Sequence, residues 1–292
     1  MKKRLLFTLC TSLLLSVGCA VQEKSPANEI KAYSKFVPER EDDFAWENDL
    51  VAFRMYGPAS KSTGTVSGVD CWLKRVDYSI LDKWYDNHQK GISYHVDHGE
   101  GHDPYHVGTS RGCGGTAVWL NGKPYPAGAY KAWRVIDNSQ EKVTFELDYA
   151  WKIDLGDLKE TKRITLALGS QLYKVESTFL LNNKPAKNLA VAVGLSTHNS
   201  AASTSADKAS GWIATWEQLK GYSLGTGAKI SAELVDDIIH IPSGNKDESH
   251  IWLISHTDEQ GKFRYSAGYA WQRAQHIQTM AAWQKYLKNS PL

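Results

Sequence analysis

Short segments of alternating hydrophobic and polar residues recur along this chain. This alternation has the two-residue period of a β-strand, in which successive side chains point to opposite faces. Turn-forming pairs such as Asn-Gly and Asn-Asn separate several of the segments. Together with short apolar runs, the pattern predicts strands over Leu50–Tyr56, Lys142–Ala150, Lys159–Leu168, Leu172–Leu181, Leu189–Leu195, Lys229–His240, His250–His256 and Tyr265–Trp271.

Helical periodicity is confined to two segments. Residues Ile80–His88 form a short candidate, and residues His276–Leu287 place their apolar side chains near one helical face. Many strands with few helices predict an all-β fold, namely one large antiparallel β-sandwich with a short C-terminal helix.

The N-terminus has the pattern of a targeting segment. Three basic residues precede the apolar run Leu5–Val17, and Leu-Ser-Val-Gly-Cys resembles a bacterial lipobox that ends at Cys19. We therefore expect a signal peptide over 1–18, a lipid on Cys19, a polar tether over 19–40 and a β-sandwich catalytic domain over 41–292, located in the periplasm or at the outer membrane. The alternative is simple cleavage near Ala20, which would release a soluble periplasmic protein.

Composition narrows the function. The formal net charge is +2 over 292 residues, which gives no electrostatic basis for nucleic-acid binding. Eleven Trp and fourteen Tyr suit either stacking on sugar rings or the core of a β-sandwich. Of the four cysteines, Cys71 and Cys113 lie beyond the N-terminal segment, and they could pair or remain free thiols.

The segment Tyr94–His106 contains four of the ten histidines. Histidine titrates near neutral pH, so such a segment can move protons or bind a metal. Gly99, Gly101 and Pro104 exclude a continuous helix. We expect a strand that ends at His98 and a loop after it, with His95 and Asp97 on one strand face and Tyr94, Val96 and His98 on the other.

Four motifs resemble a known family: Trp46–Pro58, Asp70–Arg75, Lys83–Tyr85 and Tyr94–Gly108. They are similar to a bacterial family of secreted domains of unassigned function that occurs beside polysaccharide lyases in systems that degrade uronic-acid glycans such as pectin, alginate and ulvan. The resemblance covers about Glu41–Leu287. It implies the supersandwich fold of galactose-mutarotase-like proteins and a relation to oligosaccharide dehydratases. Cys71 stands where the family suggests an aliphatic residue, which disfavours a disulfide.

The reaction that this resemblance implies is β-elimination from a uronate. Such a reaction needs a cation to neutralise the carboxylate, a base for the C5 proton and an acid for the leaving oxygen. The chain offers candidates for each role. The catalytic candidates are Tyr94, His95, His98 and His198, and the substrate-binding candidates are Arg54, Lys74, Arg75, Tyr105 and Trp271.

Other readings stay open at this point. A divalent metal such as Zn²⁺ or Mn²⁺ is possible, with His98, His102 and Asp103 as candidate ligands, and no other cofactor is indicated. Instead of a dehydratase, the chain could be a polysaccharide or oligosaccharide lyase, a mutarotase-like epimerase, or a lipoprotein that binds glycan without changing it. The expected partner is a uronic-acid oligosaccharide, and contact with the membrane is expected only through the N-terminal lipid anchor.

Overall fold

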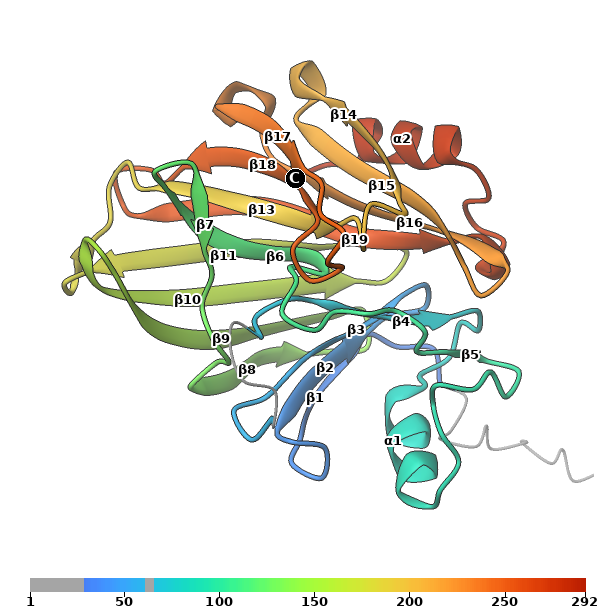
Figure 1. Cartoon of the computed structure of the whole chain (residues 1–292). Helices are drawn as coiled ribbons and strands as arrows, with labels where there is room; N and C mark the ends of the chain where they lie inside the picture. Colours follow the sequence, from blue (N-terminus) through green and yellow to red (C-terminus); the bar gives the residue numbers. More distant parts are fainter. Residues whose placement is uncertain (1–28, 61–65) are drawn as a thin grey trace, which may run out of the picture.

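A computed structural model describes residues 29–60 and 66–292. The predicted signal peptide, Cys19 and the first part of the predicted tether lie outside these residues. Within them, no helix is both long enough and apolar enough to cross a membrane. The described residues form three sheets whose strands pair in antiparallel fashion (Figure 1).

The largest sheet has nine strands, and two five-stranded sheets pack beside it. In the nine-stranded sheet the order is β14 (Ser203–Asp207), β15 (Trp212–Leu219), β16 (Tyr222–Lys229), β19 (Lys262–Trp271), β11 (Leu172–Leu181), β10 (Gly156–Ala167), β9 (Lys142–Ile153) and β8 (Ala132–Asn138), with β12 (Lys184–Pro185) beside β11. The second sheet is β17 (Asp237–Ile241), β18 (His250–His256), β13 (Ala190–Ser196), β6 (Cys113–Leu120) and β7 (Lys123–Tyr125). The N-terminal sheet is β1 (Tyr33–Val37), β2 (Asp43–Glu47), β3 (Ala52–Met55), β4 (Asp70–Lys74) and β5 (Gly101–His102).

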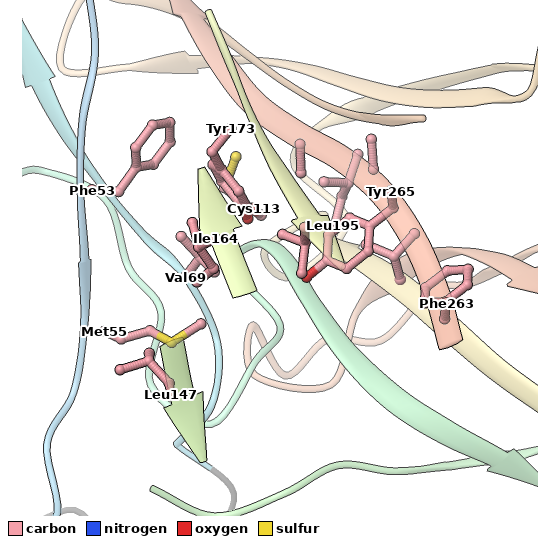
Figure 2. Close-up of a cluster of buried hydrophobic side chains, with 14 of the residues drawn as sticks. Phe53, Met55, Val69, Cys113, Leu147, Ile164, Tyr173, Leu195, Phe263 and Tyr265 are labelled. Atoms are coloured by element: carbon pink, nitrogen blue, oxygen red, sulfur yellow. The ribbon is translucent and has the colours of Figure 1, made fainter. Parts of the chain in front are cut away.

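One hydrophobic core joins the three sheets. Figure 2 shows buried side chains from β3, β6, β9, β10, β11, β13 and β19, which belong to one hydrophobic cluster. Burial of this apolar surface is the main favourable contribution to folding. The all-β sandwich predicted from the sequence is therefore confirmed, including the short C-terminal helix.

Three sequence expectations about the elements are corrected. The tether predicted over 19–40 overlaps β1, so the folded part begins before residue 41. The predicted strand Lys229–His240 is divided between the end of β16, a 3-10 turn at Ala232–Leu234 and β17, which belongs to another sheet. The predicted helices are found as α1 (Leu81–Gln89) and α2 (Met280–Asn289), displaced by a few residues.

Helix α2 lies on the outer side of β15 and β16 because its two buried side chains fit against glycines (Figure 1). Trp283 and Leu287 are fully buried. A Cβ atom added at Gly227 would come within 2.8 Å of Leu287 and 2.9 Å of Trp283, so the absence of a side chain there permits the close contact. The indole nitrogen of Trp283 also donates to the carbonyl of Thr226 at 3.0 Å.

Replacing Trp283 with alanine should lower the free energy of unfolding by about 3–5 kcal/mol, because it leaves a cavity where the indole was. Denaturant titration followed by circular dichroism measures this change. The matched control is Lys285→Ala on the exposed face of the same helix, for which a change within about 0.5 kcal/mol is expected. Equal effects of the two substitutions would show that α2 is not docked as described.

Candidate functional site

Within the segment Tyr94–His106, residues 94–100 form turns and bends rather than the predicted strand, and the short strand β5 and an irregular stretch follow. Gly99 and Gly101 adopt φ values of 108° and 125°, a region that side chains other than glycine rarely occupy. The carboxylate of Asp97 holds the turns in place by accepting the amide hydrogens of Gly99 at 2.7 Å and Gly101 at 3.2 Å. The expected division of the side chains between two strand faces is therefore wrong.

Side chains of this segment enter three separate clusters. The first surrounds Arg54 and receives Tyr94, His95 and Asp103. The second, here called the Asp97 cluster, contains Arg75, Asp97, His102, Tyr222, Trp271 and Arg273. The third surrounds His198 and receives Tyr105 and His106.

In the Arg54 cluster, one buried guanidinium faces three carboxylates. Arg54 Nη2 lies 2.5 Å from Asp70 Oδ2 and 3.1 Å from Asp103 Oδ2, and Nη1 lies 3.7 Å from Asp43 Oδ2. These four side chains are almost completely buried. The sequence suggested a substrate-binding role for Arg54, but its charge is already matched inside the protein.

Burial also changes the ionisation of these acids. It raises the pKa of Asp43 to about 7, although Arg54 and Arg40 act in the opposite direction. Burial, reinforced by the charge of Asp70, raises the pKa of Asp103 well above its ordinary value. The cluster therefore retains a proton near neutral pH, and this proton is assigned to the coupled acids as a group rather than to one residue.

Tyr94 and His95 lie at the outer edge of the Arg54 cluster. The phenol oxygen of Tyr94 accepts hydrogen bonds from Arg54 Nη1 at 3.1 Å and Arg40 Nε at 3.3 Å, and Tyr94 is buried. His95 is exposed, and its Nδ1 lies 2.8 Å from the backbone oxygen of Asp103. The structure thus brings Tyr94 and His95 together, with ring centroids 4.6 Å apart, but ties both to the Arg54 cluster.

Lys74 is not available to a substrate. Its Nζ is fully buried and lies 2.9 Å from Glu47 Oε2, and it also donates to the backbone oxygens of Asn48 and Tyr78. The same Glu47 carboxylate accepts the amide hydrogens of Ile80 and Leu81 at the start of α1. The carboxylate clamp predicted at Lys74 is wrong because this lysine stabilises the junction of sheet and helix.

The neighbouring Arg75 lies at the surface in the Asp97 cluster. Its Nη2 lies 3.3 Å from Asp97 Oδ1, and Arg273 approaches Asp97 Oδ2 through Nη1. Both arginine side chains keep 29% of their surface exposed. Burial opposes ionisation of Asp97, but the two glycine amides and Arg75 outweigh it, so the pKa of Asp97 is lowered. The carboxylate thus holds two guanidinium groups side by side.

Aromatic rings complete the Asp97 cluster. The Arg273 guanidinium lies 4.7 Å from the ring centre of the partly exposed Tyr222. Trp271 lies between Tyr222 and His102, with centroid distances of 6.2 Å and 5.7 Å. Trp271 itself is 2% exposed, so it packs inside the protein against His102 and Tyr222 and does not form the predicted sugar platform.

His102 is the titratable group of the Asp97 cluster. It is 8% exposed, and its Nδ1 is without a hydrogen-bond partner among the described residues. Burial lowers the pKa of His102, with Asp97 acting in the opposite direction and Arg273, Lys220 and Arg75 reinforcing the shift. The imidazole is therefore neutral at pH 7 and able to accept a proton.

His198 is held on both sides. Its Nδ1 lies 2.9 Å from Glu217 Oε2, and its Nε2 lies 2.9 Å from the backbone oxygen of His106. Both partners can only accept, so both ring nitrogens carry hydrogen and the ring is an imidazolium. Burial opposes this charge, but Glu217 outweighs it and raises the pKa of His198. His198 is a structural cation here rather than the predicted acid–base catalyst.

The positions of Tyr105 and His98 also do not suit the substrate-binding and catalytic roles predicted for them. Tyr105 is buried in the main core with its ring 4.8 Å from that of His198, so it does not face a substrate. His98 is exposed, and its Nε2 lies 3.2 Å from the backbone oxygen of Ser93. His106 pairs with Asp247 at 2.5 Å on the surface of the His198 cluster.

The candidate metal ligands do not meet. His98 is on the surface, His102 belongs to the Asp97 cluster and Asp103 binds Arg54. Across residues 29–60 and 66–292, no group of three or more His, Cys, Asp or Glu side chains could hold a metal ion. Cys71 and Cys113 are buried free thiols.

Sequence reasoning missed several residues of these clusters. Lys220 lies in the turn between β15 and β16, and Tyr222 is the first residue of β16. Glu217 and Asp247 come from segments that carried no motif. Arg273 could have been found from the sequence, because it follows Trp271 by two positions at the end of a predicted strand.

The chain belongs to a family defined by sequence. Residues 18–291 match the family described as "Domain of unknown function (DUF4861)". A relative from Formosa agariphila, "Uncharacterized protein P7", is 35% identical over 280 residues, which cover 90% of this chain and 69% of the relative. The predicted membership of a family of unassigned function is confirmed. The link of that family to uronic-acid glycans remains a prediction.

Solved structures give weaker likenesses. An α-galactosidase from Lactobacillus brevis matches with a TM-score of 0.37 and 9% identity over 85% of this chain and 42% of its own. A 4-α-glucanotransferase from Thermococcus litoralis matches with a TM-score of 0.35 and 7% identity over 84% and 40%. The chain thus spans about two fifths of these proteins, and similarity at this level carries no argument about activity.

The Asp43→Asn substitution should change how stability depends on pH. The folded-state pKa of Asp43, about 7, lies above its ordinary value, so its favourable contribution is present at low pH and is lost as the pH rises through about 7. The variant lacks this loss, so its stability relative to the native protein should increase by about 1.4 kcal/mol per pH unit between about pH 4 and 7. Urea unfolding across this range tests the slope, and a pH-independent difference would contradict it.

Proposed function

We propose that this protein is a carbon–oxygen lyase that acts by β-elimination on uronic-acid-containing oligosaccharides in polysaccharide degradation. Within that class we favour a dehydratase that removes water from a terminal uronate. The observation that carries the proposal is the Asp97 cluster, where two guanidinium groups lie beside a neutral, buried histidine and two aromatic rings.

Each requirement of the elimination has a candidate in this cluster. Arg75 and Arg273 can bind the substrate carboxylate through paired hydrogen bonds and so make the C5 proton more acidic. The neutral imidazole of His102 can accept that proton. The hydroxyl of Tyr222, a residue that is 36% exposed, can protonate the oxygen that leaves C4.

The bond changes balance without a further reactant. The C5–H bond breaks and its proton passes to His102, the electron pair forms the C4–C5 double bond, and the C4–O bond breaks. The leaving oxygen takes a proton from Tyr222. Water leaves in a dehydratase and a sugar leaves in a lyase, so the same residues serve either reaction and the product separates the two.

The net charge of the cluster supports an anionic substrate. Arg75, Arg273 and the neighbouring Lys220 carry three positive charges, whereas Asp97 supplies one negative charge. Like charges held together at a surface attract an anion from solution. A mutarotase-like epimerase needs no carboxylate clamp, so this excess of positive charge favours the lyase.

His102→Gln should lower kcat by about 10²- to 10⁴-fold, because it removes the proton acceptor. Turnover is measured as the rise in absorbance of the unsaturated uronate on pectin, alginate and ulvan oligosaccharides. The matched control is His98→Gln, an exposed histidine of the same segment, which should keep its activity.

Mass spectrometry of the product completes this test. Loss of one water identifies a dehydratase, and a shortened chain identifies a lyase. Absence of any unsaturated product with the native protein on all three glycans would refute elimination from these substrates, and equal losses in the two histidine variants would refute the role of His102.

Arg273→Gln should lower kcat/KM by about 10- to 100-fold, because a hydrogen bond between charged groups contributes about 1.5–3 kcal/mol. Arg264→Gln is the control, since Arg264 also extends from β19 but pairs with Glu176. Steady-state kinetics on the active oligosaccharide distinguishes the two. An unchanged kcat/KM in Arg273→Gln would place the carboxylate elsewhere.

A further inference from the structure

The distance between the predicted lipid anchor and the folded domain is short. Since β1 begins at Tyr33 and the described chain begins at Glu29, ten positions separate Glu29 from Cys19. Ten residues span at most about 35 Å when fully extended. If Cys19 carries lipid, as the sequence predicts, the face of the domain near Glu29 lies within about 35 Å of the membrane surface.

That face carries a row of exposed apolar side chains, here called the β8 patch. Ile30, Trp133, Val135 and Ile136 are 44%, 41%, 40% and 52% exposed. Three of them lie within four consecutive positions of one strand, whereas the hydrophobic side chains of the other strands are mostly buried. Exposed apolar side chains gathered in this way on one strand are a candidate interaction site.

Contacts between the first described residues and β8 fix the patch beside the start of the domain. The side chain of Gln140, just after β8, donates to Glu29, and its backbone oxygen accepts the amide hydrogen of Ala32 at 2.7 Å. Further along, Phe36 of β1 stacks on Trp133 with centroids 5.0 Å apart. The β8 patch therefore runs along β1 from the point where the chain enters the fold.

The composition of the patch suits a lipid surface better than a second protein chain. The exposed Lys131 lies two positions before Trp133, and Trp with Lys or Arg is the combination found where proteins meet lipid headgroups. Arg134, in contrast, is engaged by Glu146 and Asp148 of β9. β8 is an edge strand, but its register shifts between Val135 and Asp137. Such an irregularity disfavours the regular pairing that a strand from a second copy would need.

We infer that the β8 patch rests on the lipid surface to which the N-terminal anchor attaches the protein. The tether and the patch then act together, since an apolar surface held within a few nanometres of a bilayer meets it at a high effective concentration. This orientation is independent of the proposed reaction, and it rests on the predicted lipidation of Cys19 only for the choice of partner.

Vesicle sedimentation tests the patch without the anchor. The chain from Ala20 to Leu292 lacks both the predicted signal peptide and Cys19, and it is mixed with vesicles of phosphatidylethanolamine and phosphatidylglycerol. Ile136→Ser should lower the partition coefficient about five- to tenfold, because it removes one apolar side chain from the interface. Trp133→Ser should lower it further, and a circular dichroism melt shows whether that variant stays folded.

Leu155→Ser and Leu234→Ser are the matched controls. Both leucines are similarly exposed, at 50% and 39%, but lie outside β8, in the turn after β9 and in the 3-10 turn Ala232–Leu234. Their substitution should leave partitioning unchanged. Equal partitioning of the Ile136 and Leu155 variants would overturn the inference. A dimer that Ile136→Ser dissociates, detected by light scattering, would also overturn it and make the patch a contact between copies.

Discussion

The burial of the Arg54 guanidinium is the interaction on which the N-terminal third of the chain depends. A charge enclosed by protein costs several kcal/mol unless opposite charges and hydrogen bonds surround it. Its partners come from β2, β4 and the histidine-rich segment, in the form of Asp43, Asp70 and Asp103. The segment must therefore cross the N-terminal sheet at one fixed place, although it has almost no regular structure of its own.

The position of the Asp97 cluster follows from that constraint. Asp103 is anchored to Arg54, and His102 directly before it pairs with Leu73 of β4. The short strand β5 then directs the His102 side chain toward the end of β19, where Trp271 and Arg273 lie. A substitution at Arg54 would thus alter the position of His102 in the candidate site, although Arg54 does not contact that site directly.

Asp97 has two functions in this arrangement. It closes the glycine turns through their amide hydrogens, and it neutralises part of the charge on Arg75 and Arg273. Two guanidinium groups at a protein surface repel each other, so a carboxylate between them allows their close approach. Because each guanidinium uses one of its three nitrogens toward Asp97, both arginines retain donors for a substrate carboxylate.

The sequence predicted several strands well but missed others, among them β1, β2, β4, β6, β8, β14 and β15. The bounds of β11 and β18 agree with the predicted strands because their residues are uninterrupted by glycine or proline and are bounded by turns. It failed for β2 and β4, which are buried on both faces and so show no alternation. It also joined β16 to β17, because apolar residues continue through the turn between them while the chain passes to another sheet.

The candidate site was harder to predict because charge pairing over long sequence separations decides which polar residues remain available. The sequence identified Arg54, Lys74 and Arg75 by residue type, but the partners of Arg54 lie up to 49 positions away and that of Lys74 lies 27 positions away. Only the pairing shows that Arg54 and Lys74 are internal and Arg75 is accessible. Tyr222 and Arg273 lie more than 100 positions from Asp97, and no local pattern could bring them to it. Chemical type can therefore be read from the sequence, whereas availability depends on how the buried charges are matched across the fold.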